Sequence, residues 1–238
     1  MDKFEVTKKS SQLIVLQRIE IANPLLLKLR KIFGRYVFTN FLTKYFISSS
    51  DIGKKYYEIM LEEFLSISEE IDKPENKFFL SIGGGIGGLE AVINQRLGPK
   101  EFYFIERNFV SKKVVYGWGG SLNSEAYNNI REQKNFLISN NLKGENIHIY
   151  DYDNNKLPKL KFDVIISLLS LDYHYDFFIY LDYLKSVSKK NTKIIFDTIR
   201  PDFFKKIFNN VKVLSTQTDT VHKSKRIICS DFIKFICN

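Results

Sequence analysis

Short apolar runs alternate with longer amphipathic stretches over most of the chain from Lys77 onward. The apolar runs have the length of strands, and they occupy residues 77–82, 101–106, 146–151, 162–167 and 192–197. The stretches between them carry apolar residues at helical spacing, and they predict helices at 86–97, 123–141, 174–188 and 200–207. Strands that alternate with helices predict a parallel sheet covered by helices on both faces.

Two further apolar runs end this pattern, VKVLST at 211–216 and RIICSDF at 226–232. Only a polar turn separates them, so they predict an antiparallel hairpin at the end of the sheet. The seven runs together predict an α/β fold, with a doubly wound, mostly parallel seven-stranded sheet and an antiparallel final strand.

The first 75 residues follow a different pattern, which contains no strand–turn–helix sequence. Tyr56, Met60 and Phe64 recur at helical spacing, and Ser50 or Asp51 is placed to cap that helix. We therefore predict two parts. An N-terminal helical segment at 1–75 would form a cap over a site or a dimer surface, and a ligand-binding domain would occupy 76–238.

Composition narrows the class of protein. The chain has 238 residues, of which 44% are hydrophobic, and its formal net charge is +9. The lysines are spread along the chain in pairs and are not gathered in one block. This spread favours a solvated lysine-rich surface over a dedicated nucleic-acid or membrane patch, and a nucleic-acid partner stays as the alternative.

The cysteine content and the length of the apolar runs indicate which structural sites and which cellular location to expect. Cys229 and Cys237 lack the CxxC spacing of a zinc site, and two thiols are too few for a disulfide framework. The mixed charges at the N-terminus do not match a signal peptide. The longest apolar stretch, 164–171, is far shorter than the roughly 20 residues of a spanning helix. We expect a cytoplasmic protein with no membrane span and no metal.

The stretch FFLSIGGGIGGLEAVINQRLG, residues 78–98, packs five glycines into positions 83–88 between a predicted strand and a predicted helix. Gly83, Gly85 and Gly88 satisfy GxGxxG, a spacing that lets backbone N–H groups and a helix N-terminus approach a ligand closely. Glu106 ends the next strand, 18 residues after Gly88, near the spacing of a carboxylate that binds ribose hydroxyls. These residues predict a nucleoside cofactor and leave nicotinamide, flavin and sulfonium cofactors open.

The run FFLSIGGGIGGLE resembles motif I of the class I S-adenosylmethionine-dependent methyltransferases, and VKVLST with RIICSDF resembles the reversed final strand of their Rossmann-like sheet. The resemblance covers about residues 77–232. It implies that S-adenosylmethionine is the cofactor, that Glu106 binds its ribose, and that Asp151, or Asp153, meets the adenine amine beside Tyr152. The cofactor-binding residues expected on this basis are Ser81, Gly83, Gly84, Gly85, Gly87, Glu106, Asp151, Tyr152 and Ser167.

One position departs from the family pattern. Many members carry an acid two residues before the first glycine of the loop, and here Ser81 holds that place. A hydroxyl still forms hydrogen bonds there, but it cannot make a charge-assisted contact. The departure keeps open the alternative of a regulatory protein that binds the cofactor without catalysis.

The segment SLLSLDYHYDF, residues 167–177, follows the fourth predicted strand, where the methyl acceptor should lie. It lacks the Asn/Asp-Pro-Pro-aromatic motif of enzymes that methylate exocyclic base amines. His174 is a candidate general base, oriented by Asp172 or Asp176, with Tyr175 as a substrate contact. The alternative interpretation is a helix-capping loop with aromatic packing.

A second aromatic segment, KKVVYGWGG, lies between the second predicted strand and its helix. Tyr116 and Trp118 are side-chain types that stack on sugars and bases, so we expect them to bind substrate. With SLLSLDYHYDF, this segment loosely resembles bacterial methyltransferases found among glycan-modifying enzymes. The resulting prediction is a methyltransferase that acts, at oxygen, on a small-molecule or sugar acceptor. The alternatives are an RNA methyltransferase, a non-catalytic regulatory protein and an NAD-dependent oxidoreductase, and a homodimer is compatible with each.

Overall fold

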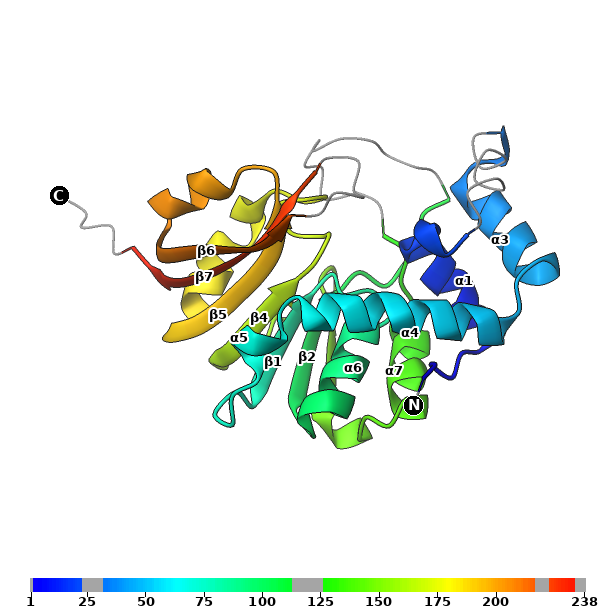
Figure 1. The fold of residues 1–238 in the computed structure, drawn as a ribbon, viewed down its shortest axis with the longest axis horizontal. Coiled ribbons are helices and arrows are strands. Elements are labelled where there is room, and N and C mark those ends of the chain that lie inside the picture. Colours follow the sequence, from blue (N-terminus) through cyan, green and yellow to red (C-terminus); the bar gives the residue numbers. More distant parts are fainter. Residues whose placement is uncertain (1, 23–31, 113–125, 217–222, 234–238) are drawn as a thin grey trace.

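The computed structural model describes residues 2–22, 32–112, 126–216 and 223–233. Seven strands form one sheet at the centre of the molecule (Figure 1). Their bounds are β1 Phe78–Ile82, β2 Glu101–Glu106, β3 Ile147–Asp151, β4 Phe162–Ser167, β5 Ser188–Thr198, β6 Phe208–Thr216 and β7 Lys225–Phe232. Every predicted strand is therefore present, and β2 and β4 have the predicted bounds.

The strand order is β3-β2-β1-β4-β5-β7-β6. Strands β1 to β5 pair in parallel, and β7 lies antiparallel between β5 and β6. This is the Rossmann-like arrangement of class I methyltransferases that the resemblance implied, so the predicted fold class is confirmed. Order reverses between β1 and β4, and in such sheets ligands bind at the carboxyl ends of the strands beside that switch point.

Two hydrophobic cores flank the sheet, because successive side chains of a strand point to opposite faces. Phe79 packs into the core that contains helices α4 (Ser49–Leu65) and α6 (Gly88–Leu97), whereas Leu80 packs into the core beside α8 (Leu181–Val187). Figure 1 shows α4 and α6 together on the near face of the sheet. Both faces of the central strands are buried, which explains their predominantly apolar sequences.

The helices differ from their predicted bounds at the ends. The helix expected at 123–141 is α7, Ile130–Ser139, because the side chain of Asn129 accepts from Glu132 N and so caps the helix there. The expected helix at 174–188 consists of a 3₁₀ turn, Phe177–Ile179, and α8, and the expected helix at 200–207 is a 3₁₀ segment, Pro201–Lys206.

The N-terminal segment is helical, as predicted. It contains α1 (Lys8–Gln17), a 3₁₀ turn at Ile19–Ile21, α3 (Arg35–Tyr45), α4 and α5 (Ser68–Ile71). Ser48, and neither Ser50 nor Asp51, caps α4 through a hydrogen bond from Asp51 N. Buried residues of α1 and α4 share one core with α6 and α7, so these helices pack directly on the sheet domain. The division at residue 75 stays a prediction.

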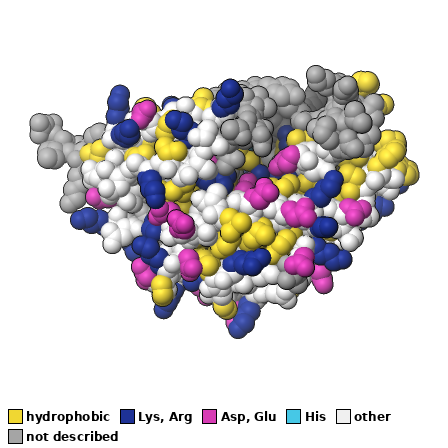
Figure 2. Space-filling model, viewed as in Figure 1, with side chains coloured by type: hydrophobic (Ala, Val, Ile, Leu, Met, Phe, Trp, Pro, Cys, Tyr) yellow, Lys and Arg dark blue, Asp and Glu magenta, His cyan; other side chains and the backbone are white. Residues whose placement is uncertain are grey.

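Two surface properties bear on function. Within the described residues, no helix is both long and apolar enough to cross a bilayer. On the face in Figure 2, Lys and Arg side chains are scattered among Asp and Glu side chains.

Candidate functional site

The glycine loop, residues 83–87, connects the end of β1 to the start of α6. Gly83, Gly85 and Gly87 have φ values of +65°, +66° and +89°, in the left-handed region that favours glycine. A Cβ on Gly83 would also lie 2.1 Å from the Ser170 hydroxyl oxygen. The glycines are therefore required both by the turn and by the close approach of the loop after β4.

Glu106, the last residue of β2, lies against this loop with 5% of its surface exposed. One of its carboxylate oxygens accepts a hydrogen bond from Gly85 N at 2.9 Å, while the Asn128 amide donates to Gly85 O at 3.0 Å. Burial, together with the nearby Glu90, raises the pKa of Glu106 well above its ordinary value. The predicted ribose-binding acid is thus at the glycine loop.

Two residues of the N-terminal helices also hold the loop, and the sequence analysis missed both. The Gln17 side chain, at the end of α1, accepts from Ile86 N at 3.1 Å and donates to Tyr127 O at 2.6 Å. The Tyr56 hydroxyl, on α4, accepts from Gly88 N at 3.2 Å. Gln17 is 69 residues from Ile86, and no local pattern marks such a contact.

Ser81 and Glu90 lie together beneath the loop. They are 3% and 2% exposed, and among the described residues Ser81 Oγ and Glu90 Oε2 have no hydrogen-bond partner. A Cβ on Gly84 would lie 2.2 Å from Ser81 Oγ and 3.2 Å from Glu90 Oε1. Position 81 itself has no acid, but Glu90 on α6 places a buried carboxyl group close to it. Burial raises the pKa of Glu90 to about 7.

We expect Glu90→Gln to remove a pH-dependent loss of stability. The folded pKa of about 7 lies above the ordinary value of 4.5, so wild-type stability is full below pH 4.5, falls as pH rises, and reaches its minimum above pH 7. From pH 5 to pH 8 the variant should lose about 2.5 kcal/mol less free energy of unfolding than wild type. Urea unfolding at both pH values measures this difference.

The matched control is Glu145→Gln, on an exposed residue of the turn before β3. It should leave the pH dependence of stability as in wild type. If Glu90→Gln and wild type lose the same stability between the two pH values, the raised pKa of Glu90 is wrong.

The loop after β4 faces the glycine loop and contains two strained residues. Leu169 and Asp172 have φ values of +53° and +58°, which are uncommon for residues with a side chain. Leu169 N donates to Asp197 Oδ2 at 3.0 Å, and this bond holds the strained backbone in place. The loop is therefore fixed from β5, the neighbouring strand.

The two predicted catalytic residues have different surroundings. Asp172 is fully buried and accepts hydrogen bonds at 2.5 Å from both Thr198 and Arg200. His174 is exposed, its N–H bonds to Ser170 O at 2.7 Å, and its ring meets the ring of Tyr173 edge to face. Asp172 therefore anchors the loop after β4 to β5 and Arg200, whereas the His174 ring lies at the surface.

The other predicted residues lie at the same edge of the sheet. The Ser167 hydroxyl donates to Ile82 O at 2.7 Å and accepts from Leu171 N at 3.0 Å, so it joins β1 to the loop after β4. Asp151 accepts from Asp153 N and from the Asn154 amide, which closes the turn after β3.

Aromatic side chains lie next to Glu106. The centre of the Tyr152 ring is 5.4 Å from the centre of the Tyr180 ring. The backbone N–H of Tyr152 donates to Glu106 O at 2.8 Å. Burial raises the pKa of Tyr180, and the nearby Glu106 and Tyr175 raise it further. Tyr180 was not predicted. Tyr116 and Trp118 lie outside the described residues.

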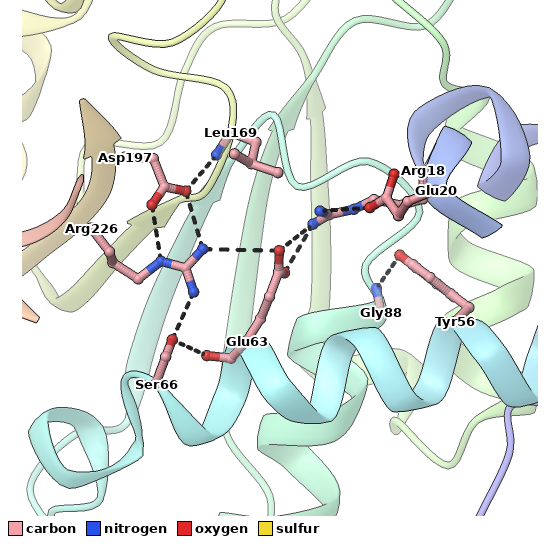
Figure 3. Close-up of polar contacts among 9 residues, drawn as sticks. All are labelled: Arg18, Glu20, Tyr56, Glu63, Ser66, Gly88, Leu169, Asp197 and Arg226. Atoms are coloured by element: carbon pink, nitrogen blue, oxygen red, sulfur yellow. Dashed lines mark hydrogen bonds and ion pairs between the residues drawn. The ribbon is translucent and has the colours of Figure 1, made fainter. Parts of the chain in front are cut away.

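A buried chain of ion pairs joins the end of the sheet to the N-terminal helices (Figure 3). Arg226 on β7 makes two hydrogen bonds to Asp197, at 3.0 and 3.1 Å, and lies 3.9 Å from Glu63 on α4. Glu63 also pairs with Arg18 at 2.8 Å. Burial alone would lower the pKa of Arg18, but Glu63 and Glu20 outweigh it and raise that pKa. The sequence analysis missed this network, because its members are up to 208 residues apart.

The residues at this edge of the sheet form one candidate site. It combines a glycine loop whose positions leave no room for side chains, a buried acid at the second strand end, neighbouring aromatic rings, and a second buried acid, Glu90, on α6. In the described part of the chain, no group of three or more His, Cys, Asp or Glu side chains is arranged to hold a metal ion.

No protein-family model matches the chain, and no curated protein matches it. Among solved structures, the mitomycin 7-O-methyltransferase MmcR is 12% identical, with a TM-score of 0.49 over 94% of this chain and 67% of that one. The B. subtilis tRNA methyltransferase TrmK is 12% identical, with a TM-score of 0.43 over 71% and 64% of the two chains. The plantazolicin methyltransferase BpumL, in complex with SAH, is 15% identical, with a TM-score of 0.40 over 83% and 62%. The chain thus spans about two thirds of the length of these structures.

Proposed function

We propose that this protein is an S-adenosylmethionine-dependent methyltransferase whose acceptor is a small molecule or sugar hydroxyl. The observation that carries the proposal is the position of Glu106, buried at the end of β2 and hydrogen-bonded to the glycine loop at Gly85 N. A carboxylate at that point, beside a glycine-rich strand-to-helix loop, is suited to the two hydroxyls of a ribose.

The residues of the site fit this cofactor. Gly83 and Gly85 let the loop backbone pack against Ser170 and Gln17, whose side-chain oxygens would lie 2.1 and 2.5 Å from an added Cβ, and Glu106 would hold the ribose. Glu90 and Glu106 are buried beside the loop, and the described residues contain no salt bridge to either, whereas the nearby Glu63 pairs with Arg18 and lies 3.9 Å from Arg226. This excess of carboxyl groups suits a ligand with a positive sulfonium and an ammonium group. When bound, the cofactor supplies a methyl group activated by the positive charge on sulfur.

His174 is the proposed general base. Its ring lies at the surface of the loop after β4, and Ser170 of that loop is in contact range of Gly83. At this position His174 would take the proton of the acceptor hydroxyl as its oxygen is methylated. Tyr175, with Tyr116 and Trp118, would bind the acceptor.

Isothermal titration calorimetry with S-adenosylmethionine, S-adenosylhomocysteine and NAD tests the cofactor. We expect both sulfur ligands to bind and NAD to give no heat. Binding of NAD alone would reject the methyltransferase proposal in favour of an oxidoreductase. A screen of sugar hydroxyl acceptors and transfer RNA, with a labelled methyl group, then tests the acceptor, and binding without transfer to any of them favours a regulatory protein.

We expect Glu106→Gln to weaken S-adenosylmethionine binding by about 10- to 100-fold, the value of one or two hydrogen bonds to a charged group. The amide keeps the size of the side chain but removes the charge. Glu101→Gln, at the other end of β2, is the matched control and should bind like wild type. Equal affinities for the Glu106 and Glu101 variants would remove Glu106 from the cofactor site.

A further inference from the structure

Helix α3 has an exposed apolar face. Of the 13 large hydrophobic residues that are exposed in the described chain, six lie within residues 32–46. Val37, Phe41 and Tyr45 are spaced by four residues and are 56%, 47% and 62% exposed, so they form one stripe along the helix. The stripe continues at Phe46 and, before the helix, at Ile32 and Phe33. In Figure 2, hydrophobic side chains gather at the right-hand end of the molecule, where Figure 1 places α3.

The opposite face of α3 is already used. Phe38, Thr39 and Leu42 are at most 2% exposed, and Gln12 of α1 bonds to Asn40 of α3. The exposed rings contact one another, with the ring of Phe41 at 5.4 Å from Tyr45 and 5.2 Å from Phe46. An apolar patch of this kind on the outside of a protein marks an interaction site.

The charge of the segment identifies the partner. Within the exposed segment, residues 32–46, the charged residues are Arg35 and Lys44, and there is no Asp or Glu. Lys44 lies on the exposed side of α3, with its ammonium 4.9 Å from the centre of the Tyr45 ring. Cations beside exposed aromatic and aliphatic side chains are the combination by which interfacial helices bind anionic lipid.

We propose that the exposed face of α3, residues 32–46, docks on an anionic phospholipid surface. A second copy of the chain suits this face less well. A symmetric dimer would place the segment against itself, with cations near cations and no carboxylate of the segment to pair with them. An anionic bilayer provides both the apolar layer and the negative charge.

This surface is connected to the candidate site. At the start of α3, Arg35 bonds to Leu16 O, and its guanidinium carbon lies 4.3 Å from the centre of the Tyr127 ring. Tyr127 O and Ile86 N both bond to Gln17. These contacts link the start of α3 to the glycine loop. The inference goes beyond the proposed function, because it holds whether or not the protein transfers methyl groups.

Co-sedimentation of the full chain with vesicles tests the proposal. We expect binding to vesicles of phosphatidylcholine with about 30% phosphatidylglycerol, weaker binding at high salt, and little binding to phosphatidylcholine alone. Val37→Ser/Phe41→Ser/Tyr45→Ser should lower the partition coefficient about tenfold or more, and Lys44→Glu should lower it on anionic vesicles only. The matched control, Leu65→Ser/Ile138→Ser/Val213→Ser, alters three residues of similar exposure on other elements and should bind like wild type.

The outcomes separate lipid from protein partners. Failure of the folded wild-type protein to bind anionic vesicles overturns the proposal, as does an equal loss of binding in the control triple variant. A dimer that the α3 triple variant disrupts, without vesicle binding by wild type, assigns the face to a second copy instead. The single variant Phe41→Ser repeats the test if the triple variant unfolds. Cofactor calorimetry is unaffected by either result.

Discussion

Gly85→Val should raise the dissociation constant for S-adenosylmethionine about 100-fold or more. Gly85 has φ +66°, a conformation that strains a β-branched residue by about 1–3 kcal/mol. The new Cβ would lie 2.5 Å from Gln17 Oε1, so the amide of Gln17 must leave Ile86 N. We expect the loop of the variant to relax away from this conformation, so that binding must restore it against strain and a lost hydrogen bond, at a cost of about 3 kcal/mol or about 100-fold in affinity.

Gly98→Val is the control for backbone strain. Gly98 ends α6 at φ +78°, and an added Cβ there meets no atom within 4 Å. The two variants should lose similar stability through the backbone, but only Gly85→Val should lose the cofactor in calorimetry. If a folded Gly85→Val protein binds within about threefold of wild type, the glycine loop is not the cofactor site.

Arg226→Met should lower the free energy of unfolding by about 3–5 kcal/mol, because it leaves the carboxylate of Asp197 buried without its partner. Arg226 and Asp197 are 1% and 0% exposed, and Arg226 also donates to Ser66 at 2.7 Å. The loop after β4 is affected as well, since Asp197 accepts from the strained Leu169. Urea unfolding, followed by circular dichroism, measures the loss.

Two further variants isolate the buried charge. Arg226→Met/Asp197→Leu leaves no lone charge and should recover part of the stability that the single variant loses. Lys205→Met breaks a pair with Asp202 at 2.6 Å whose side chains are 65% and 84% exposed, and it should cost about 1 kcal/mol or less. A loss for Arg226→Met no greater than for Lys205→Met would contradict the structural importance of the buried network.

The strands could be predicted because their sequences are locally sufficient. A parallel strand buried on both faces is mostly apolar, and the runs that end at Glu106 and Ser167 are apolar at four of their six positions. Helix ends were predicted less well, since they depend on single caps. Helix α7 begins at Ile130, directly after its cap Asn129 and seven residues after the predicted start. Helix α4 is capped by Ser48, which accepts from Asp51 N.

The candidate site could be predicted only in its local parts. Glycine spacing and the acid at the second strand end identified the loop and Glu106, which meet at 2.9 Å. Asp172 was predicted as catalytic from its place beside His174, and its bonds to Arg200 and Thr198 could not be anticipated. The buried acid under the loop, Glu90, was overlooked, although it lies on the first turn of the helix that the glycines open.

The sequence by itself determined the strand pattern, the glycine loop and the acid that faces it, because each of these follows from a short stretch of chain and from the known geometry of parallel sheets. Only the tertiary structure decided which distant side chains complete the site. Gln17 and Glu63 reach it from the N-terminal helices, and Arg226 reaches it from the last strand. Their positions result from packing two helices and a hairpin against one core, and such contacts between remote residues leave no periodic pattern along the chain.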